Sequence, residues 1–102
     1  MDAQLRRGVL DVLVLSALKN EDSYGYKIIK DLKPIIELSE STLYTILKRL
    51  IDSGMVVVRS EEFEGRLRKY YHITAEGCKR IVDFKNEWKE LMNIYSFISE
   101  EK

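Results

Sequence analysis

The spacing of hydrophobic and polar residues predicts helices over most of the chain. Between residues 3 and 19, two apolar stripes recur at three- and four-residue steps, a pattern typical of a helix enclosed by other elements. A polar turn at residues 20–23 ends on Ser23, a candidate N-cap, and a second apolar helical face follows until Pro34 stops it. The first third of the chain is therefore expected to be a helical pair.

A third amphipathic helix has the clearest pattern. Residues 35–38 are short and β-prone, and Ser39 then serves as an N-cap candidate. From 40 to 53, apolar residues recur at i, i+3, i+4, i+7 and i+8, and Gly54 is suited to end the helix. This pattern predicts a short strand followed by a helix with one buried face.

The second half of the chain predicts a hairpin and a long helix. Two β-prone runs, 55–59 and 69–73, flank a polar connection that contains Gly65. Thr74 is then the N-cap candidate of a helix from Ala75 to about Ile98. The order helix, helix, short strand, helix, hairpin, long helix predicts a mainly α fold with a small β-hairpin, the winged helix-turn-helix arrangement.

Composition changes little along the chain, so we expect one compact unit. Within it, residues 1–74 form the predicted winged helix-turn-helix DNA-binding domain, and residues 75–102 form a C-terminal dimerisation helix. In a helix-turn-helix, the second helix of the pair enters the major groove, which here is the helix from residue 40 to residue 53.

The polar side of that helix carries candidate DNA contacts. Short hydroxyl side chains near the start of this helix can reach DNA bases or phosphates. Lysine and arginine side chains one turn further on can contact the DNA backbone. These candidates are Ser41, Thr42, Tyr44, Thr45, Lys48 and Arg49. The alternative is a merely solvated helix surface. In the hairpin, Arg66, Arg68 and Lys69 follow Gly65, whereas three glutamates precede it. Such a basic arm suits a minor groove or flanking phosphates, although it also suits an edge hairpin kept soluble by charge.

The last helix has an apolar seam with a heptad spacing of 3, 4, 3, 4 and 3 residues. This helix of roughly 36 Å is longer than a small domain needs for its own core. We therefore predict a two-fold homodimer. The expected interface residues are Leu5, Val9, Ile81, Phe84, Trp88, Leu91, Tyr95 and Ile98.

Trp88 lies near the middle of the seam and allows two interpretations. It is either an interface anchor or one of two paired indoles that enclose a flat aromatic ligand at the dimer centre. In the second case the remaining pocket residues are Phe84, Leu91, Met92, Val12 and Glu87, the last suited to a cationic ligand.

Charge and cysteine content narrow the classes of function. The 17 basic and 17 acidic residues cancel, yet the bases gather on the recognition helix and after Gly65, so neutrality is the sum over a polarised molecule. A single Cys78, expected in the core, and a single His72, expected to be structural, leave no metal site. No nucleophile–base set or cofactor loop is present, so we predict no cofactor and no enzyme. Without a membrane span or secretory signal in the sequence, a cytoplasmic protein is expected.

Four segments together resemble the PadR family of bacterial transcriptional regulators. They are RGVLDVLVLSAL (7–18), SYGYKIIKDL (23–32), ELSESTLYTILKRL (37–50) and RLRKYYHITAEG (66–77). The resemblance implies a winged-helix homodimer that usually represses a promoter, with phosphate contact at Tyr44 and a wing that includes Arg68 to Tyr71, hence Tyr70. The single C-terminal helix resembles the smaller subfamily, and the spacing from Thr74 to Trp88 is similar to that of its multidrug-binding members.

The chain departs from the family pattern at three places. Thr45 stands where a proline is common, Glu40-Ser41 replaces a usual Pro-Gly, and Met92 stands where an acidic group can occur. The operator sequence and the ligand therefore do not follow from the resemblance. Three hypotheses stay open: a repressor released from a palindromic operator by a planar aromatic ligand, the same regulator controlled by its abundance or a protein partner, and a winged-helix protein-interaction module.

Overall fold

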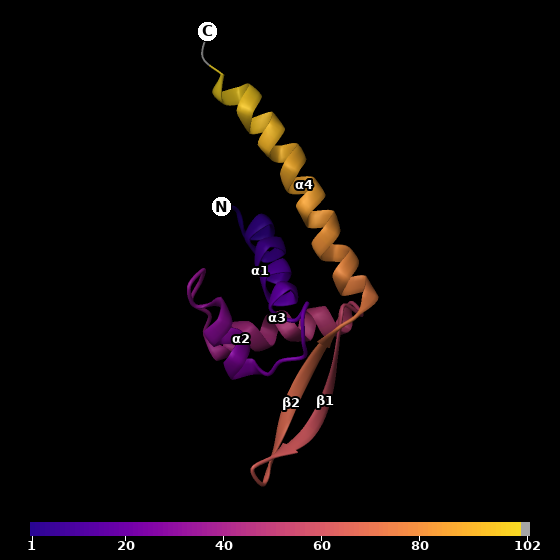
Figure 1. Ribbon diagram of the computed structural model, residues 1–102. Coiled ribbons are helices and arrows are strands. Elements are labelled where there is room, and N and C mark those ends of the chain that lie inside the picture. Colours follow the sequence, from indigo (N-terminus) through magenta and orange to yellow (C-terminus); the bar gives the residue numbers. More distant parts are fainter. Residues whose placement is uncertain (101–102) are drawn as a thin grey trace.

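The computed structural model describes residues 1–100, which form four helices and one two-stranded hairpin (Figure 1). In chain order they are α1 (Ala3–Ala17), α2 (Gly25–Leu32), α3 (Glu40–Asp52), β1 (Val56–Phe63), β2 (Arg66–Ile73) and α4 (Ala75–Ser99). The predicted mainly helical fold with a small hairpin is confirmed. Glu101 and Lys102, at the end of the predicted 75–102 helix, lie outside the described residues.

One hydrophobic core lies between α1, α2, α3 and the base of the hairpin. The periodic face of α3 supplies four of its residues, Leu43, Ile46, Leu47 and Leu50, all almost fully buried. Burying each such side chain contributes about 1.5–3 kcal/mol. Two of the three predicted N-caps also form: the Ser39 hydroxyl accepts from the Thr42 N–H at 3.2 Å, and the Thr74 hydroxyl accepts from the Gly77 N–H at 3.2 Å. The position of α3 therefore follows from its own sequence pattern.

The short strand predicted at residues 35–38 is wrong. Residues 33–35 form a turn, with the Ile35 and Ile36 N–H groups donating to the Leu32 carbonyl at 2.9 and 2.8 Å. Leu38 is buried in the core although its backbone is irregular. On the side of β2 away from β1, a single isolated bridge forms instead at Ser23, whose backbone exchanges hydrogen bonds with Tyr71 at 3.2 and 2.8 Å. Ser23 is therefore not the N-cap of α2; Tyr24 occupies that position without a side-chain cap.

The hairpin, called the wing below, is longer than the β-prone runs predict. β1 and β2 pair antiparallel from Val56–Ile73 out to Phe63–Arg66. The turn consists of Glu64 and Gly65, both with positive φ (49° and 80°), which matches the twist of the strands. This turn extends the ladder through charged residues that have little β-propensity of their own.

The helix α4 begins against the base of the wing and then leaves the body of the molecule (Figure 1). A Cβ on Gly77 would lie only 2.5 Å from the Met55 carbonyl oxygen, so only glycine allows this approach. The chain measures 66 × 26 × 22 Å, and its radius of gyration of 16.0 Å exceeds the roughly 13 Å of a compact domain of this length. Cys78, expected in the core, is exposed because it lies on the outer side of α4.

Candidate nucleic-acid interface

The outward side of α3 carries the predicted hydroxyl residues. Ser41, Thr42, Tyr44, Thr45 and Lys48 are all exposed. The Thr45 hydroxyl donates to the Ser41 carbonyl at 2.9 Å, and the Ser39 hydroxyl donates to Thr42 Oγ1 at 2.9 Å. Both hydrogen bonds join residues of the first turns of the helix. The short polar side chains are therefore held in place locally and remain exposed to a partner.

The two basic side chains of α3, Lys48 and Arg49, have different surroundings. Lys48 is 79% exposed, and its only salt bridge among the described residues is a 3.4 Å contact with Asp52, one turn along. Arg49 points instead to α1, where its guanidinium forms a two-pronged ion pair with Asp11; Nε lies 3.4 Å from Oδ2, and Nη2 also contacts Oδ1. The side chains of Arg49 and Asp11 are only 34% and 19% exposed. Lys48 is therefore available to a partner, whereas Arg49 connects α3 to α1.

Tyr44 lies against the beginning of α2. A Cβ on Gly25 would be 2.6 Å from the Tyr44 hydroxyl oxygen, so the absence of a side chain at Gly25 makes room for the phenol. Tyr44 is still half-exposed. Its hydroxyl is thus placed in the space between α2, α3 and the wing.

That space is an open groove of about 1130 Å³. One wall is the start of α2 with Tyr44, and the other is the tip and second strand of the wing. The three basic residues predicted in the wing, Arg66, Arg68 and Lys69, all line this groove. Neither Arg66 nor Lys69 forms a salt bridge within residues 1–100, so both leave positive charge facing the groove. Tyr70 is half-buried on β2.

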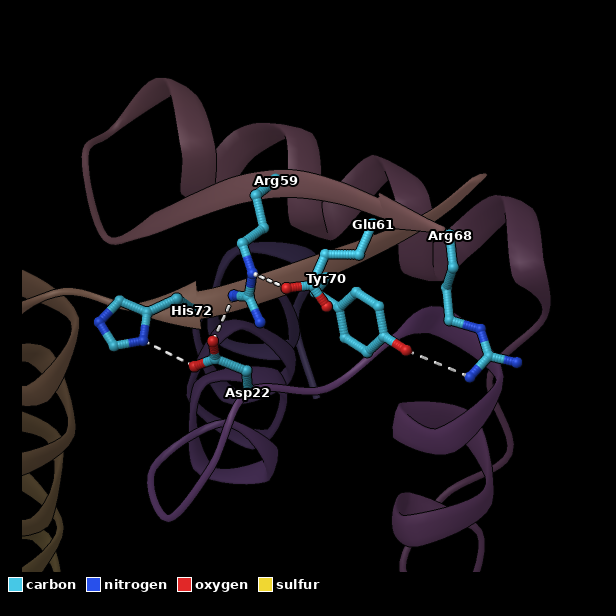
Figure 2. Close-up of polar contacts among 6 residues, drawn as sticks. All are labelled: Asp22, Arg59, Glu61, Arg68, Tyr70 and His72. Carbon is cyan, nitrogen blue, oxygen red and sulfur yellow. Dashed lines mark hydrogen bonds and ion pairs between the residues drawn. The ribbon is translucent and has the colours of Figure 1, made fainter. Parts of the chain in front are cut away.

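A polar cluster that the sequence analysis missed joins the wing to the loop before α2 (Figure 2). Asp22 accepts from Arg59 and from His72 Nδ1, the latter at 2.7 Å, and Arg59 Nε also donates to Glu61 at 3.1 Å. The hydrogen bond from His72, which has the larger effect, and the hydrogen bond from Arg59 hold the pKa of Asp22 below its ordinary value of 3.8. The position of Asp22 results from the pairing of Ser23 with Tyr71, because that pairing places their neighbours in the chain, Asp22 and His72, side by side.

The predicted dimer and ligand residues lie on α4 and on the facing side of α1. The rings of Phe84 and Trp88 stack at 6.0 Å with an interplanar angle of 20°, and Arg80 lies 5.8 Å from the Phe84 ring. Glu87 pairs with Arg80 at 3.8 Å. Arg80, Phe84 and Glu87 border a hollow between α1 and α4 that Leu5 also lines, and Trp88 lies outside that lining.

The remaining residues of this set differ in exposure. Trp88, Leu91, Met92, Tyr95 and Ile98 are exposed on α4. Val12 is buried and Val9 half-buried on α1, whereas Ile81 packs against the chain's own core. In residues 1–100, no group of three His, Cys, Asp or Glu side chains gathers as a metal site, and no helix is both long and apolar enough to cross a membrane.

Comparison with known proteins identifies the chain's family. Residues 14–83 match the transcriptional regulator PadR-like family. A transcriptional regulator from Clostridium thermocellum is 31% identical, with a TM-score of 0.83 over 96% of this chain and 100% of that one. PadR family regulators from Clostridium difficile (31%, TM-score 0.79, 89% and 98% covered) and Eggerthella lenta (32%, TM-score 0.84, 97% and 88% covered) are similar. The chain therefore belongs to the PadR-like family of transcriptional regulators, which are DNA-binding proteins and not enzymes.

Proposed function

We propose that this protein is a cytoplasmic homodimeric repressor that binds a palindromic operator through α3 and the wing. The observation that carries the proposal is the division of α3 into two sides. Leu43, Ile46, Leu47 and Leu50 are buried, whereas the hydroxyl residues and Lys48 are exposed next to the basic groove. Short polar side chains let a helix approach the edges of the DNA bases. Exposed lysine and arginine side chains neutralise the DNA phosphates.

Within the interface, different residues have different tasks. Ser41, Thr42 and Thr45 face the bases, and Tyr44 with Lys48 contacts phosphates. Arg66 and Lys69 of the wing meet flanking phosphates, with Tyr70 supporting the wing surface. Because Arg49 is bound to Asp11, we assign it the orientation of α3 rather than a phosphate contact.

The apolar surface of α4 supports the dimer. Trp88, Leu91, Tyr95 and Ile98 recur at heptad spacing and are about half-exposed or more, with Trp88 and Leu91 at 48% and 49%. Such a seam is costly to leave in water, and a second α4 of the same kind would cover it. Two-fold symmetry would then present two α3 helices to inverted half-sites.

Selection from a pool of random DNA duplexes tests this function. The protein should enrich sequences with two inverted half-sites whose centres lie about one helical turn, roughly 34–36 Å, apart. A variant with Ser41, Thr42 and Thr45 all changed to alanine should bind without that preference. A parent protein that enriches no sequence, or enriches only unpaired half-sites, would contradict the proposal.

We further propose that a planar aromatic ligand binds between the two protomers at Trp88. The stacked Phe84 and Trp88 rings on the same helix as Glu87 favour this candidate, with Leu91 and Met92 as exposed apolar surface of α4. Val12, the sixth residue expected in this pocket, is buried on α1 and offers the ligand no free surface. Trp88 is the only tryptophan, so its fluorescence reports on this place alone. Ethidium, as a planar cationic probe without DNA, should quench it, and Trp88→Ala should lose ethidium binding. Equal binding by a dimeric Trp88→Ala variant would favour a regulator controlled by abundance or a protein partner.

A further inference from the structure

The wing receives little support from the core. Its base is anchored by Val56, Tyr71 and Ile73, which are buried. Beyond Val56 every residue of β1 is exposed, and among residues 66–70 of β2 only Arg68 and Tyr70 are partly covered. An isolated two-stranded hairpin is marginally stable in water, so contacts at the outer half must decide the direction in which the wing points.

Arg68 makes those contacts. The carbon at the centre of its guanidinium lies 3.9 Å from the ring centroid of Tyr24 and 3.7 Å from that of Phe63. Tyr24 is the N-cap residue directly before α2, and Phe63 is the last residue of β1. The cation is thus held between a ring of the helical body and a ring at the tip of the wing.

Tyr70 completes the arrangement. Arg68 Nη1 donates to the Tyr70 hydroxyl at 3.4 Å (Figure 2), and the Tyr24 and Tyr70 rings meet edge to face at 5.8 Å. The guanidinium carbon of Arg59 lies 5.3 Å from the centroid of the Tyr70 ring, and Arg59 is itself bound to Asp22. A continuous series of contacts therefore runs from the loop before α2 to the wing tip along one face of the hairpin.

Arg66 and Lys69, on the same strand, lie in no such series. Within the described residues 1–100, neither cation stacks over an aromatic ring or forms a salt bridge, so both charges are available to a partner, whereas that of Arg68 is enclosed by two rings. A planar guanidinium stacks on rings far better than an ammonium does. The choice of arginine at residue 68 is thus explained by the two rings.

We propose that Arg68 is a positioning residue: through Tyr24 and Phe63 it fixes the outer half of the wing against α2, and so sets the spacing between the wing and α3 before DNA binds. This assignment rests on the proposed DNA-binding function. It replaces, for Arg68, the phosphate contact that the sequence predicts, while Arg66 and Lys69 keep theirs.

Amide hydrogen exchange in the DNA-free protein tests the first half of the proposal. Arg68→Lys keeps the charge but loses the planar group that stacks, and Tyr24→Leu removes one ring while leaving the sequence of the wing unchanged. Both should speed exchange at residues 61–69 by about three- to tenfold, the factor expected for one cation–π contact. The matched controls Tyr24→Phe and Arg66→Lys should exchange like the parent. Parent-like exchange in Arg68→Lys would overturn the proposal.

DNA binding tests the second half, with a duplex selected by the parent and with poly(dI-dC) as non-specific DNA. Arg68→Lys and Tyr24→Leu should weaken binding to the selected duplex by about threefold to tenfold and leave non-specific binding within twofold. Arg68→Gln should keep the parent's salt slope, whereas Lys69→Gln should lower it by about one. A slope lowered equally by Arg68→Gln would show a phosphate contact and overturn the positioning role.

The two arms separate this inference from the function on which it rests. A parent protein that selects no duplex and does not bind poly(dI-dC) would overturn the proposed function and the DNA-related half of the inference. The exchange measurement contains no DNA, so it still decides whether Arg68 holds the wing.

Discussion

Asp11 of α1 binds Arg49 of α3 through a two-pronged ion pair between residues 38 positions apart in the sequence. The helix α1 also faces α4 across the hollow that Leu5, Phe84 and Glu87 line. Asp11 lies on that hollow as well. The pair is therefore the direct polar connection between the helix proposed to enter DNA and the region proposed to form the dimer.

Removing this pair should destabilise the fold. We expect Asp11→Asn to lower the free energy of unfolding by about 1–2 kcal/mol, because Arg49 would keep a half-buried charge without its partner. Urea unfolding measures the change. Asp52→Asn, which removes the exposed partner of Lys48, is the matched control and should cost under about 0.5 kcal/mol. Equal losses in the two variants would contradict the structural role of Asp11.

Gly25→Ala should affect DNA binding more than stability. The new methyl group would meet the end of the Tyr44 side chain, which is half-exposed and can rotate away. We expect unfolding free energy within about 1 kcal/mol of the parent and a DNA affinity reduced as in Tyr44→Phe. Titration of both variants with the selected duplex checks this. Parent-like affinity in Gly25→Ala would show that the placement of the Tyr44 hydroxyl does not matter.

Asp22 should make stability depend on pH. Its pKa is lowered in the folded protein by His72 and Arg59, so its contribution is complete above its unfolded pKa near 3.8 and is lost as the pH falls through the lower folded value. Thermal unfolding should therefore show Asp22→Asn less stable than the parent at pH 6, with the difference shrinking below about pH 4. A difference that stays constant down to pH 2.5 would contradict this account.

The dimer prediction depends on the exposed seam of α4. Leu91→Glu would place two charges where two apolar side chains are expected to meet, and analytical ultracentrifugation should then show monomers. Lys85→Glu, a charge change at an exposed position outside the seam, should leave the dimer intact. Dimers that persist in Leu91→Glu would place the interface elsewhere.

Hydrophobic spacing was sufficient to predict the helices. The buried face of α3, its Ser39 cap and the Thr74 cap of α4 depend on residues within one or two turns of one another, which a sequence pattern records. The strand expected at residues 35–38 failed because β-propensity needs a pairing partner. In the fold that partner position beside β2 is occupied by Ser23.

The hydrophobic pattern could not predict which side chains far apart in the sequence contact each other in the fold. Nothing in the spacing connects Asp22 with Arg59 or His72, which lie 37 and 50 residues away. The same holds for the ring of Tyr24 beside Arg68. The contacts of Asp22 and Tyr24 depend on how the loop before α2 docks on β2, and the pair of Arg49 with Asp11 depends on how α1 packs on α3. Arg49 and Arg68 were therefore both expected to face DNA, and the structure gives both internal partners.

The salt dependence of DNA binding tests the central claim that α3 and the wing contact DNA phosphates. The parent and the variants Lys48→Gln, Lys69→Gln and Lys85→Gln would be titrated with the selected duplex at several salt concentrations. The account predicts that Lys48→Gln and Lys69→Gln each lower the slope of log affinity against log salt by about one, whereas Lys85→Gln on α4 leaves it unchanged. An unchanged slope in both Lys48→Gln and Lys69→Gln would contradict the account.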